Sequence, residues 1–451
     1  MATVGEALEL AVRALQAGDL GEVERLCGLV IGAVPGQPDA LRMRATVALQ
    51  QGRTGDAAAW LGAVADALPD DPESHHNLAI ALRADGRLAE AGDRFARTLA
   101  LEPDHAGGRG NLIDSALRHA GAPPDAWRTA VLAPPPQLHR FQIEITTWCN
   151  LKCAECSRTV AIEAGRWTDK HMRLDDYRRI IDHSVPSGVL VLQGVGEPTL
   201  HPQLVDMIAV ARTSNKFPAI TFNSNAVGRG IDYFARAKAA GLTHLSVSVD
   251  SFDPTIANAC RFGTKVEKLA GRLAELAAMF PGLAVSIVAS RLNLEDIPRT
   301  IARLAALGVR TVEIQPLINY QPAAASTVDN TLSPADQARL TTALAGARRA
   351  HRTTEIAVAA ALDPNEARCA RPFHAPYVTV DGYLTPCCTC FDPAVLGHTS
   401  LIEQPMTEAW RRPAVQAWLA DYFTTEPAIC VGCCFNPATL ADRTAVPLPA
   451  Q

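Results

Sequence analysis

Ten of the twelve cysteines fall into two groups, and their spacing is the strongest chemical signal in the chain. The first group, Cys149-x3-Cys153-x2-Cys156, comes directly after a run that predicts a β-strand. This spacing lets three thiolates converge from one loop. A cubane of four irons usually takes four cysteine ligands, so three leave one iron open to a small molecule. A structural zinc site is the alternative, although zinc favours paired Cys-x2-Cys elements with four ligands.

By its spacing and its place after a strand, this loop resembles the cluster-binding loop of the radical S-adenosylmethionine (SAM) superfamily. The resemblance implies that Cys149, Cys153 and Cys156 bind a 4Fe–4S cluster whose open iron chelates the amino and carboxylate groups of SAM. The reduced cluster would cleave SAM to a 5′-deoxyadenosyl radical, which abstracts hydrogen from a substrate. One position departs from the family, because the residue before the third cysteine is commonly aromatic and here it is Glu155.

The same resemblance nominates four SAM contacts near the ends of later strands: Glu197, Asn225, Ser248 and Arg261. Glu197 lies in a Gly-Val-Gly-Glu-Pro segment, similar to the family's Gly-Gly-Glu-Pro motif, and would accept hydrogen bonds from the SAM ammonium group, while the glycines let the backbone approach the ligand. Asn225 is expected near the ribose, Ser248 at the ribose or the carboxylate, and Arg261 at the carboxylate. A turn asparagine and a solvated arginine are the alternatives. No general base is identifiable, so the catalytic residues stay unassigned.

The second group begins with Cys369 and a Gly382-x4-Cys387 turn and closes with Cys430-x2-Cys433. This spacing resembles the twitch domain, a shortened relative of the SPASM domain. The resemblance implies that the four cysteines bind one auxiliary iron–sulfur cluster, of the 4Fe–4S type. A zinc ribbon is the alternative for two cysteine groups separated by a long insertion. Three surplus cysteines could replace a ligand, bind a second cluster or act in catalysis: Cys388, Cys390 and Cys434.

The first 120 residues repeat with a period of 34, marked in one register by Gly18, Gly52 and Gly86 and by Pro35, Pro69 and Pro103. Glycine is expected to end the first helix of each pair, and proline to follow the second. Helix-turn-helix units of this length are typical of tetratricopeptide (TPR) repeats, which the segment resembles; a generic helical bundle is the alternative. Residues 121–139 are rich in proline, which predicts a semi-rigid extended linker without a packed helix.

Residues 140–350 alternate short β-rich runs with helical stretches, a pattern that predicts parallel βαβ units. Six such runs predict an open, partial (β/α)6 barrel with its chemistry at the carboxyl ends of the strands. Residues 355–451 are rich in cysteine and turns and predict a small domain held together by metal. The expected fold class is therefore multidomain α and α/β: helical repeats (1–120), a radical SAM barrel and a twitch-like C-terminal domain.

Bulk composition argues against several classes of partner. With 48% hydrophobic and 20% charged residues, the chain is typical of folded globular proteins. Its formal charge of −5 offers no broad positive field for phosphate backbones, so a nucleic-acid partner is not expected. The N-terminus lacks the basic start of a secretion signal, and no apolar run could span a bilayer, so we expect a cytoplasmic protein without a membrane partner.

The expected function is oxidative modification of a peptide or protein, because TPR arrays form concave surfaces that bind such partners. The first alternative is dehydrogenation or another modification of a small molecule, such as a sugar or aminocyclitol. The second is a non-catalytic interaction scaffold stapled by metal. An enzyme of the first two kinds also needs a reducing partner, such as a flavodoxin or ferredoxin.

Overall fold

The computed structural model describes residues 3–105, 107–119, 121–165, 167–317, 330–358, 368–431 and 433. The chain divides into two compact units, Met1–Ala133 and Pro134–Gln451. Within the described residues, no helix combines the length and apolar character needed to cross a membrane.

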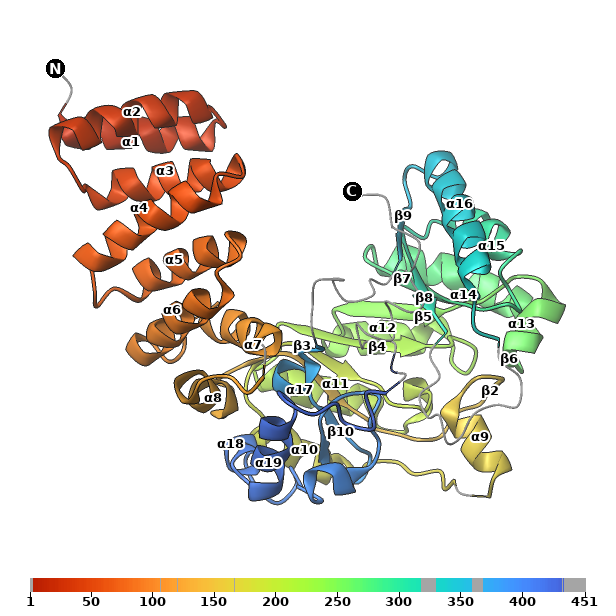
Figure 1. Ribbon diagram of the computed structural model, residues 1–451. Helices are drawn as coiled ribbons and strands as arrows, with labels where there is room; N and C mark the ends of the chain where they lie inside the picture. Colours follow the sequence, from red (N-terminus) through yellow and green to blue (C-terminus); the bar gives the residue numbers. More distant parts are fainter. Residues whose placement is uncertain are drawn as a thin grey trace. The chain divides into compact units, whose positions relative to one another are not determined.

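The first unit consists of helix pairs that repeat as the sequence predicts (Figure 1). Gly18, Gly52 and Gly86 end the first helix of their pairs with φ of +77°, +74° and +80°, a left-handed conformation that favours glycine. The period of 34 residues is thus confirmed as a structural repeat. The helices are α1 (Val4–Gln16), α2 (Leu20–Ala33), α3 (Pro38–Gln50), α4 (Thr54–Ala67), α5 (Pro72–Ala84), α6 (Leu88–Leu101), α7 (Gly108–Arg118) and α8 (Asp125–Leu132).

Helix α8 corrects the prediction of an extended linker over residues 121–139. Its prolines flank the helix and do not interrupt it, since Pro124 is the N-cap and the next proline, Pro134, follows Leu132. The helix packs because Trp127 is buried and its indole Nε1 donates a 2.8 Å hydrogen bond to Asp93. A Cβ added to Gly92 would lie 2.1 Å from the Trp127 ring, so this glycine makes room for the indole.

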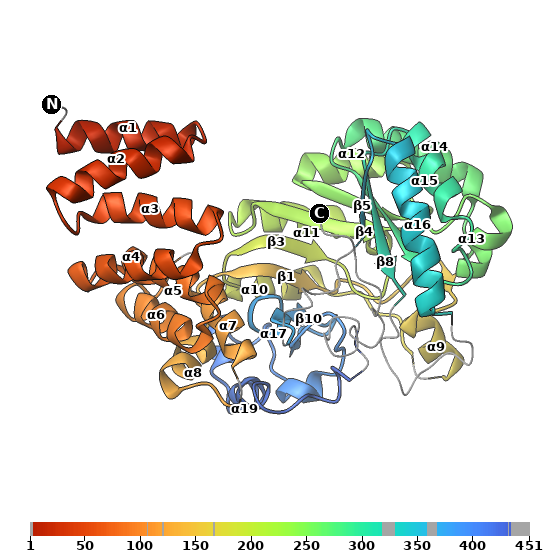
Figure 2. The same ribbon diagram turned by 45° about the horizontal axis from the view of Figure 1, so that its top comes forward.

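The second unit is built on a mostly parallel sheet in which six strands confirm the six predicted runs (Figure 2). Its order is β11-β10-β1-β3-β4-β5-β7-β8-β9. The six strands are β1 (Leu138–Ile143), β3 (Ser187–Leu192), β4 (Ala219–Ser224), β5 (His244–Ser248), β7 (Ala284–Ala289) and β8 (Thr311–Pro316). A seventh parallel strand, β9 (Glu355–Val358), extends one edge and was not predicted.

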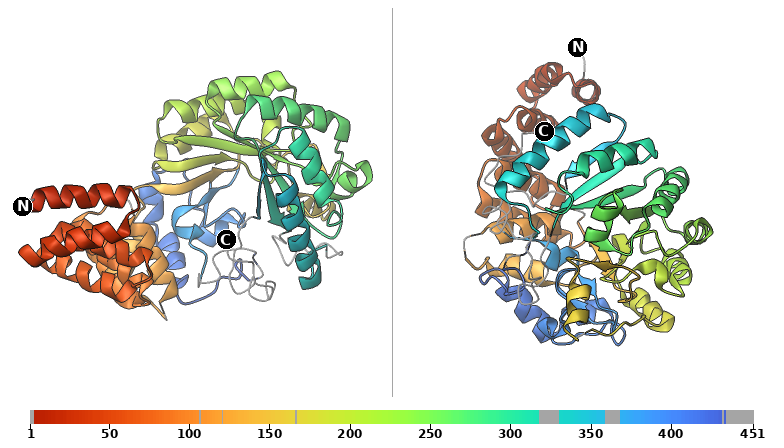
Figure 3. Two further views of the ribbon diagram at one scale, coloured as in Figure 1. Left: turned by 90° about the horizontal axis from the view of Figure 1, so that it is seen from above. Right: turned by 90° about the vertical axis from the view of Figure 1, so that its right-hand side faces the viewer.

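Helices cover the outer face of this curved sheet, as the green and cyan ribbons of Figure 3 show. Alternation along the strands explains the arrangement: in β4, Ile220 is buried and does not line the inner cavity, whereas the half-buried Thr221 and Asn223 do. The covering helices are α10 (Leu174–His183), α11 (Leu204–Thr213), α12 (Ile231–Ala240), α14 (Val266–Met279), α15 (Ile297–Ala306) and α16 (Pro334–Ala350). The predicted α/β barrel architecture is confirmed.

The segment with the second cysteine group joins the same sheet. Strand β10 (Tyr377–Val378) pairs in parallel with β1, and β11 (Leu384–Thr385) pairs antiparallel with β10. Gly382 lies in the turn between them with φ of +83°. Short helices follow: α17 (Arg371–His374) before the hairpin, and η3 (Pro393–Leu396), α18 (Met406–Trp410) and α19 (Pro413–Asp421) after it. The C-terminal segment is therefore anchored on the barrel wall.

Replacing Gly92 by alanine tests the packing of α8. The added methyl group overlaps the Trp127 ring, and overpacking of this kind costs about 1–3 kcal/mol. We expect the melting midpoint of the helical unit to fall by about 2–4 °C per kcal/mol, measured by circular dichroism. Gly62→Ala is the matched control, because nothing lies within 4 Å of its Cβ position. Equal melting of Gly92→Ala and the wild type would contradict the packing account.

Candidate metal centres and cofactor cavity

The loop that carries the first cysteine group is held by a two-residue ribbon. Strand β2 (Lys152–Cys153) pairs antiparallel with β6 (Arg261–Phe262), so Cys153 lies opposite Arg261. The thiols of Cys149, Cys153 and Cys156 are half-buried and line one cavity, and Cys156 lies close enough to help raise the pKa of Cys149 and of Cys153. Burial is the larger cause and raises the pKa of Cys153 to about 12. The structure therefore brings the three predicted ligands together.

A buried arginine fixes the other end of this loop. Arg158 lies in α9 (Ser157–Glu163), directly after the third cysteine, and is 5% exposed. Its guanidinium donates to the Thr147 carbonyl at 2.9 Å and pairs with Asp169 at 2.9 Å. Sequence reasoning missed this residue, because an arginine after a cysteine motif carries no signal of burial.

The cysteine loop borders a cavity of about 730 Å³ inside the barrel. Its wall is unusually polar for a barrel interior, where branched apolar side chains usually fill the space. The polar side chains come from neighbouring strands, and among them are Thr221, Asn223, Ser246, Ser248, Ser286, Glu313 and Gln315. The cavity suits a polar ligand of some size, such as a nucleoside derivative with a substrate beside it.

Gly194 and Gly196 line the cavity, so their predicted role of admitting a ligand stays a prediction, and both also serve the packing of the chain itself. A Cβ on Gly194 would lie 2.3 Å from the Glu144 side chain, and one on Gly196 would lie 2.4 Å from the Thr146 carbonyl oxygen. The neighbouring Glu197 amide donates a 2.8 Å hydrogen bond to the Trp148 carbonyl. The Gly-Val-Gly-Glu-Pro segment thus clamps the backbone that leads into the cysteine loop.

Glu197 is 3% exposed and borders the cavity. Its Oε1 accepts hydrogen bonds from the Thr199 amide and hydroxyl and from the Ser224 hydroxyl, and its Oε2 accepts one from the Asn225 amide at 2.8 Å. Burial nevertheless raises the pKa of this carboxyl group. Oε2 keeps a lone pair beyond these bonds, so the predicted SAM contact remains a prediction that the geometry permits.

Asn225 and Ser248 both line the cavity. The Asn225 side chain donates to Asn150 at 2.9 Å and accepts from the Val227 amide, which ties strand β4 to the cysteine loop. Ser248 accepts a 2.9 Å hydrogen bond from Asn223, and its own hydroxyl proton has no acceptor among the described residues. A ligand in the cavity can supply that acceptor.

Arg261 does not lie in solvent. It forms a 2.6 Å ion pair with Asp250, and its guanidinium approaches the Cys153 sulfur to 4.0 Å. Asp250 in turn accepts from the Val288 amide at 3.0 Å. A partly buried cation held beside a thiol favours the thiolate, which is the form that binds metal.

The second cysteine group surrounds a separate cavity of about 220 Å³. All four predicted ligands line it: Cys369, Cys387, Cys430 and Cys433. Burial raises the pKa of Cys369 and Cys430 to about 12 and that of Cys387 to about 11, with the neighbouring thiols adding to each shift. The Tyr422 hydroxyl donates a 2.8 Å hydrogen bond to the Cys369 carbonyl and closes one side.

Two of the three surplus cysteines, Cys388 and Cys390, do not line this smaller cavity. Cys388 borders the large barrel cavity, where Arg371 donates a hydrogen bond to its sulfur at 3.4 Å. Cys390 is 3% exposed and lies outside both cavity linings. Cys434 lies outside the described residues. Cys387 and Cys388 are adjacent in a turn after β11, yet Cys387 lines the smaller cavity and Cys388 the larger one.

Glu144 connects the segment before the first cavity's Glu197 to the C-terminal hairpin, and sequence reasoning missed it. It is 4% exposed and accepts hydrogen bonds from the Val195 amide at 3.1 Å and the Val380 amide at 3.2 Å. Burial raises its pKa. Because Val380 follows β10 and Val195 lies between the two glycines, this carboxyl group connects the C-terminal hairpin to the Gly-Val-Gly-Glu-Pro segment.

Two family models match this chain. Residues 143–314 match the radical SAM superfamily, and residues 369–434 match the SPASM iron–sulfur cluster-binding domain. Among curated relatives, a PqqA peptide cyclase of Xanthomonas oryzae is 28% identical over 184 residues, which are 40% of this chain and 48% of that protein. A tungsten-containing aldehyde ferredoxin oxidoreductase cofactor-modifying protein of Pyrococcus furiosus is 25% identical over 193 residues, 40% of this chain and 52% of that one. The chain spans about half the length of these relatives.

Solved structures share the fold at low identity. SuiB of Streptococcus suis, bound to its precursor peptide SuiA, superposes with a TM-score of 0.55 and 12% identity, over 82% of this chain and 87% of SuiB. anSMEcpe with bound AdoMet superposes with a TM-score of 0.51 and 14% identity, over 66% of this chain and 88% of that one.

Glu144→Gln tests the connection that Glu144 makes between the C-terminal hairpin and the Gly-Val-Gly-Glu-Pro segment. One glutamine oxygen cannot replace both carboxyl oxygens, and an unsatisfied buried donor costs about 1–3 kcal/mol, so the melting temperature of the second unit should fall. Since burial raises the folded-state pKa, Glu144 contributes stability that is complete below the ordinary value of 4.5 and is lost as the pH rises through the folded value. The difference in melting temperature between the variant and the wild type should therefore become smaller as the pH rises. Glu267→Gln, at an exposed position, is the control. A difference in melting temperature that grows with rising pH would contradict the raised pKa of Glu144.

Proposed function

We propose that this chain, with its radical SAM domain followed by a SPASM domain, is an enzyme that cleaves SAM reductively and oxidatively modifies a peptide or protein. The observation that carries the proposal is the convergence of Cys149, Cys153 and Cys156 at the rim of one polar cavity. Three thiols from one loop can hold a cubane and leave one iron open. The proposed domains are residues 1–120, to which α8 adds a further helix, 140–350 and 355–451.

The residues present fit a SAM-binding cluster. When bound, the cluster supplies the electron that splits SAM into methionine and a 5′-deoxyadenosyl radical able to abstract hydrogen from carbon. Arg261 favours the ligating form of Cys153, and Glu197 holds the Asn225 amide and the Ser224 hydroxyl in place. Ser248 and the free lone pair of Glu197 face the cavity and would bind polar groups of SAM.

The second set of cysteines fits one auxiliary cluster, for which we propose Cys369, Cys387, Cys430 and Cys433 as ligands. Four thiols around one cavity leave no position for a substrate, so a fully ligated cluster there suits electron transfer. Such a cluster can accept an electron from a substrate radical and so complete a two-electron oxidation. A reducing protein such as a flavodoxin or ferredoxin would supply the electron for the SAM-binding cluster in the cytoplasm.

A peptide or protein is the proposed substrate. The PqqA peptide cyclases are named for a peptide, and SuiB was crystallised with its precursor peptide. The helical repeats of the first unit add a surface of the kind that binds extended chains. A sugar or aminocyclitol substrate is the alternative, which the polar cavity would also accommodate.

Iron counts and SAM cleavage test the cluster assignment. After anaerobic reconstitution, we expect about eight irons in the wild type and about four in a Cys149/Cys153/Cys156→Ala variant, which forms no 5′-deoxyadenosine from SAM under reduction. Cys387→Ala should also lose about four irons, whereas its neighbour Cys388→Ala, the matched control, should keep them. A colourless protein that holds only zinc would refute the enzyme and favour the metal-stapled scaffold.

Removing residues 1–133 tests the peptide substrate. The second unit holds both cysteine groups, so the truncated protein should still convert SAM to 5′-deoxyadenosine. Turnover of a peptide, followed by mass spectrometry as loss of two hydrogens, should fall at least about tenfold in kcat/KM if the repeats bind the peptide. Unchanged peptide turnover would show that the repeats do not dock the substrate.

A further inference from the structure

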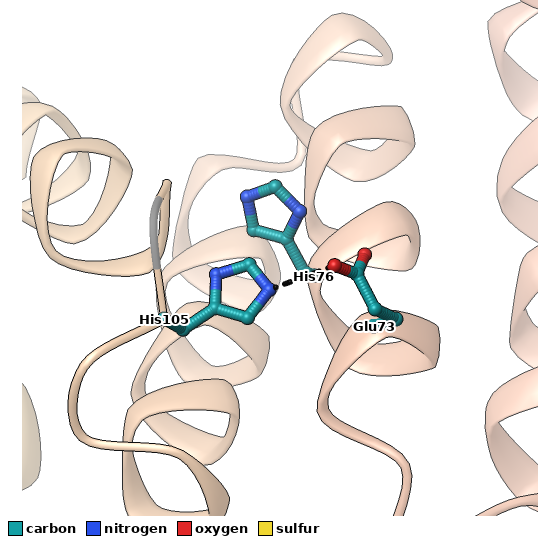
Figure 4. A group of neighbouring side chains, drawn as sticks. All are labelled: Glu73, His76 and His105. Atoms are coloured by element: carbon teal, nitrogen blue, oxygen red, sulfur yellow. Dashed lines mark hydrogen bonds and ion pairs between the residues drawn. The ribbon is translucent and has the colours of Figure 1, made fainter.

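Three side chains in the helical-repeat unit form a cluster that the proposed function does not use. Glu73 and His76 stand three residues apart on α5, so they share one face of that helix. His105 comes from the connection between α6 and α7. One possible ligand atom from each lies within 4.8 Å of the others, and Figure 4 shows the His105 ring facing the Glu73 carboxylate with His76 beside them.

We propose that Glu73, His76 and His105 bind a divalent metal ion of the zinc type. Two imidazoles and one carboxylate are a known three-ligand set for Zn²⁺ that leaves a fourth position to water or to a partner. The distance between His105 Nε2 and Glu73 Oε1 is 3.3 Å. Two ligand atoms about 2.0–2.1 Å from a tetrahedral ion are about 3.3 Å apart, so this pair already has the spacing of one edge of the site.

The surroundings keep both imidazoles close together. Their ring centroids are 4.4 Å apart, and His105 is 7% exposed. Gly107 allows the approach, because a Cβ there would lie 2.9 Å from His76 Nε2. Burial, and then the neighbouring His105, lower the pKa of His76.

If no metal binds, a hydrogen bond between His105 and Glu73 accounts for the positions of these two side chains but not for that of His76. His76 Nε2 lies 3.1 Å from the Asn111 amide, but its Nδ1 has no hydrogen-bond partner among the described residues. Coordination through Nδ1 puts the ring proton on Nε2, so the Asn111 amide must turn its oxygen toward it. Arg83, which now donates to that oxygen at 2.8 Å, keeps Asp114 as its partner at 3.3 Å. Asn111 then orients the ligand, as outer-shell partners of metal-bound histidines usually do.

Zinc uptake by the full-length, cluster-loaded protein tests the proposal. In equilibrium dialysis with elemental analysis, the wild type should bind about one Zn²⁺ more than Glu73→Gln or His105→Gln. The matched controls are Glu90→Gln, also in the first turn of a helix, and His351→Gln, at the end of α16. Both should bind as the wild type does. Equal uptake by all five proteins would overturn the site.

A second measurement needs no variant and so does not depend on how the substitutions fold. Diethyl pyrocarbonate modifies accessible neutral histidines, and peptide mapping locates the product. Zn²⁺ should reduce modification of His76 at least about tenfold while His351 reacts equally with and without zinc, because coordination occupies the reactive nitrogen. Equal modification of His76 in both conditions would overturn the proposal.

Discussion

The close approach of Gly196 to the backbone of Thr146 and Trp148 is the contact on which the candidate site depends. In the first cysteine loop, which leaves the end of β1, regular pairing is limited to the two-residue strand β2, so neighbouring segments must set the course of the loop. A glycine that can lie against two carbonyl oxygens, together with the Glu197–Trp148 backbone hydrogen bond, sets that course on one side. The β2–β6 ribbon and the ion pair between the buried Arg158 and Asp169 set it on the others. Three thiols can converge only because their loop is held in this way.

Buried carboxyl groups make the same region rigid. Glu144 and Glu197 are almost fully buried, and a buried charge is costly unless several donors satisfy it. Each has backbone amides as partners, from segments that are distant in sequence. Removing one partner would leave an unsatisfied group, so these contacts specify one arrangement of the strand ends. Burial raises the pKa of both groups in spite of these hydrogen bonds.

The two cysteine groups share one sheet, and this has a functional consequence. Because β10 pairs with β1, the hairpin that carries Cys387 and Cys388 lies on the wall of the barrel. Cys387 belongs to the smaller cavity and Cys388 to the larger one. Cys387, which would hold the auxiliary cluster, is therefore next in the chain to a residue that lines the larger cavity, and this would suit electron exchange with a substrate bound there.

Local patterns in the sequence were enough to predict the period of the repeats, the six strands and the grouping of the cysteines. Each is encoded within a few residues: Gly18 needs a left-handed turn, alternation in β4 separates helix-facing from cavity-facing side chains, and Cys149, Cys153 and Cys156 share one loop. The linker prediction was wrong because Trp127 finds its partners 34 residues earlier, at Asp93 and beside Gly92. Proline content alone does not reveal such a contact.

Only the tertiary structure decided which distant groups meet. Glu144 contacts Val380, which is 236 residues further along, and this pairing follows from the order of the strands in the sheet. The tertiary structure equally decides three other features: the partner of Arg261, the roles of Gly194 and Gly196, and the separation of Cys387 from Cys388. The sequence by itself determined which residues carry the chemistry, because spacing is local. The structure decided what holds them, since a buried polar group must find its partner wherever the fold places one.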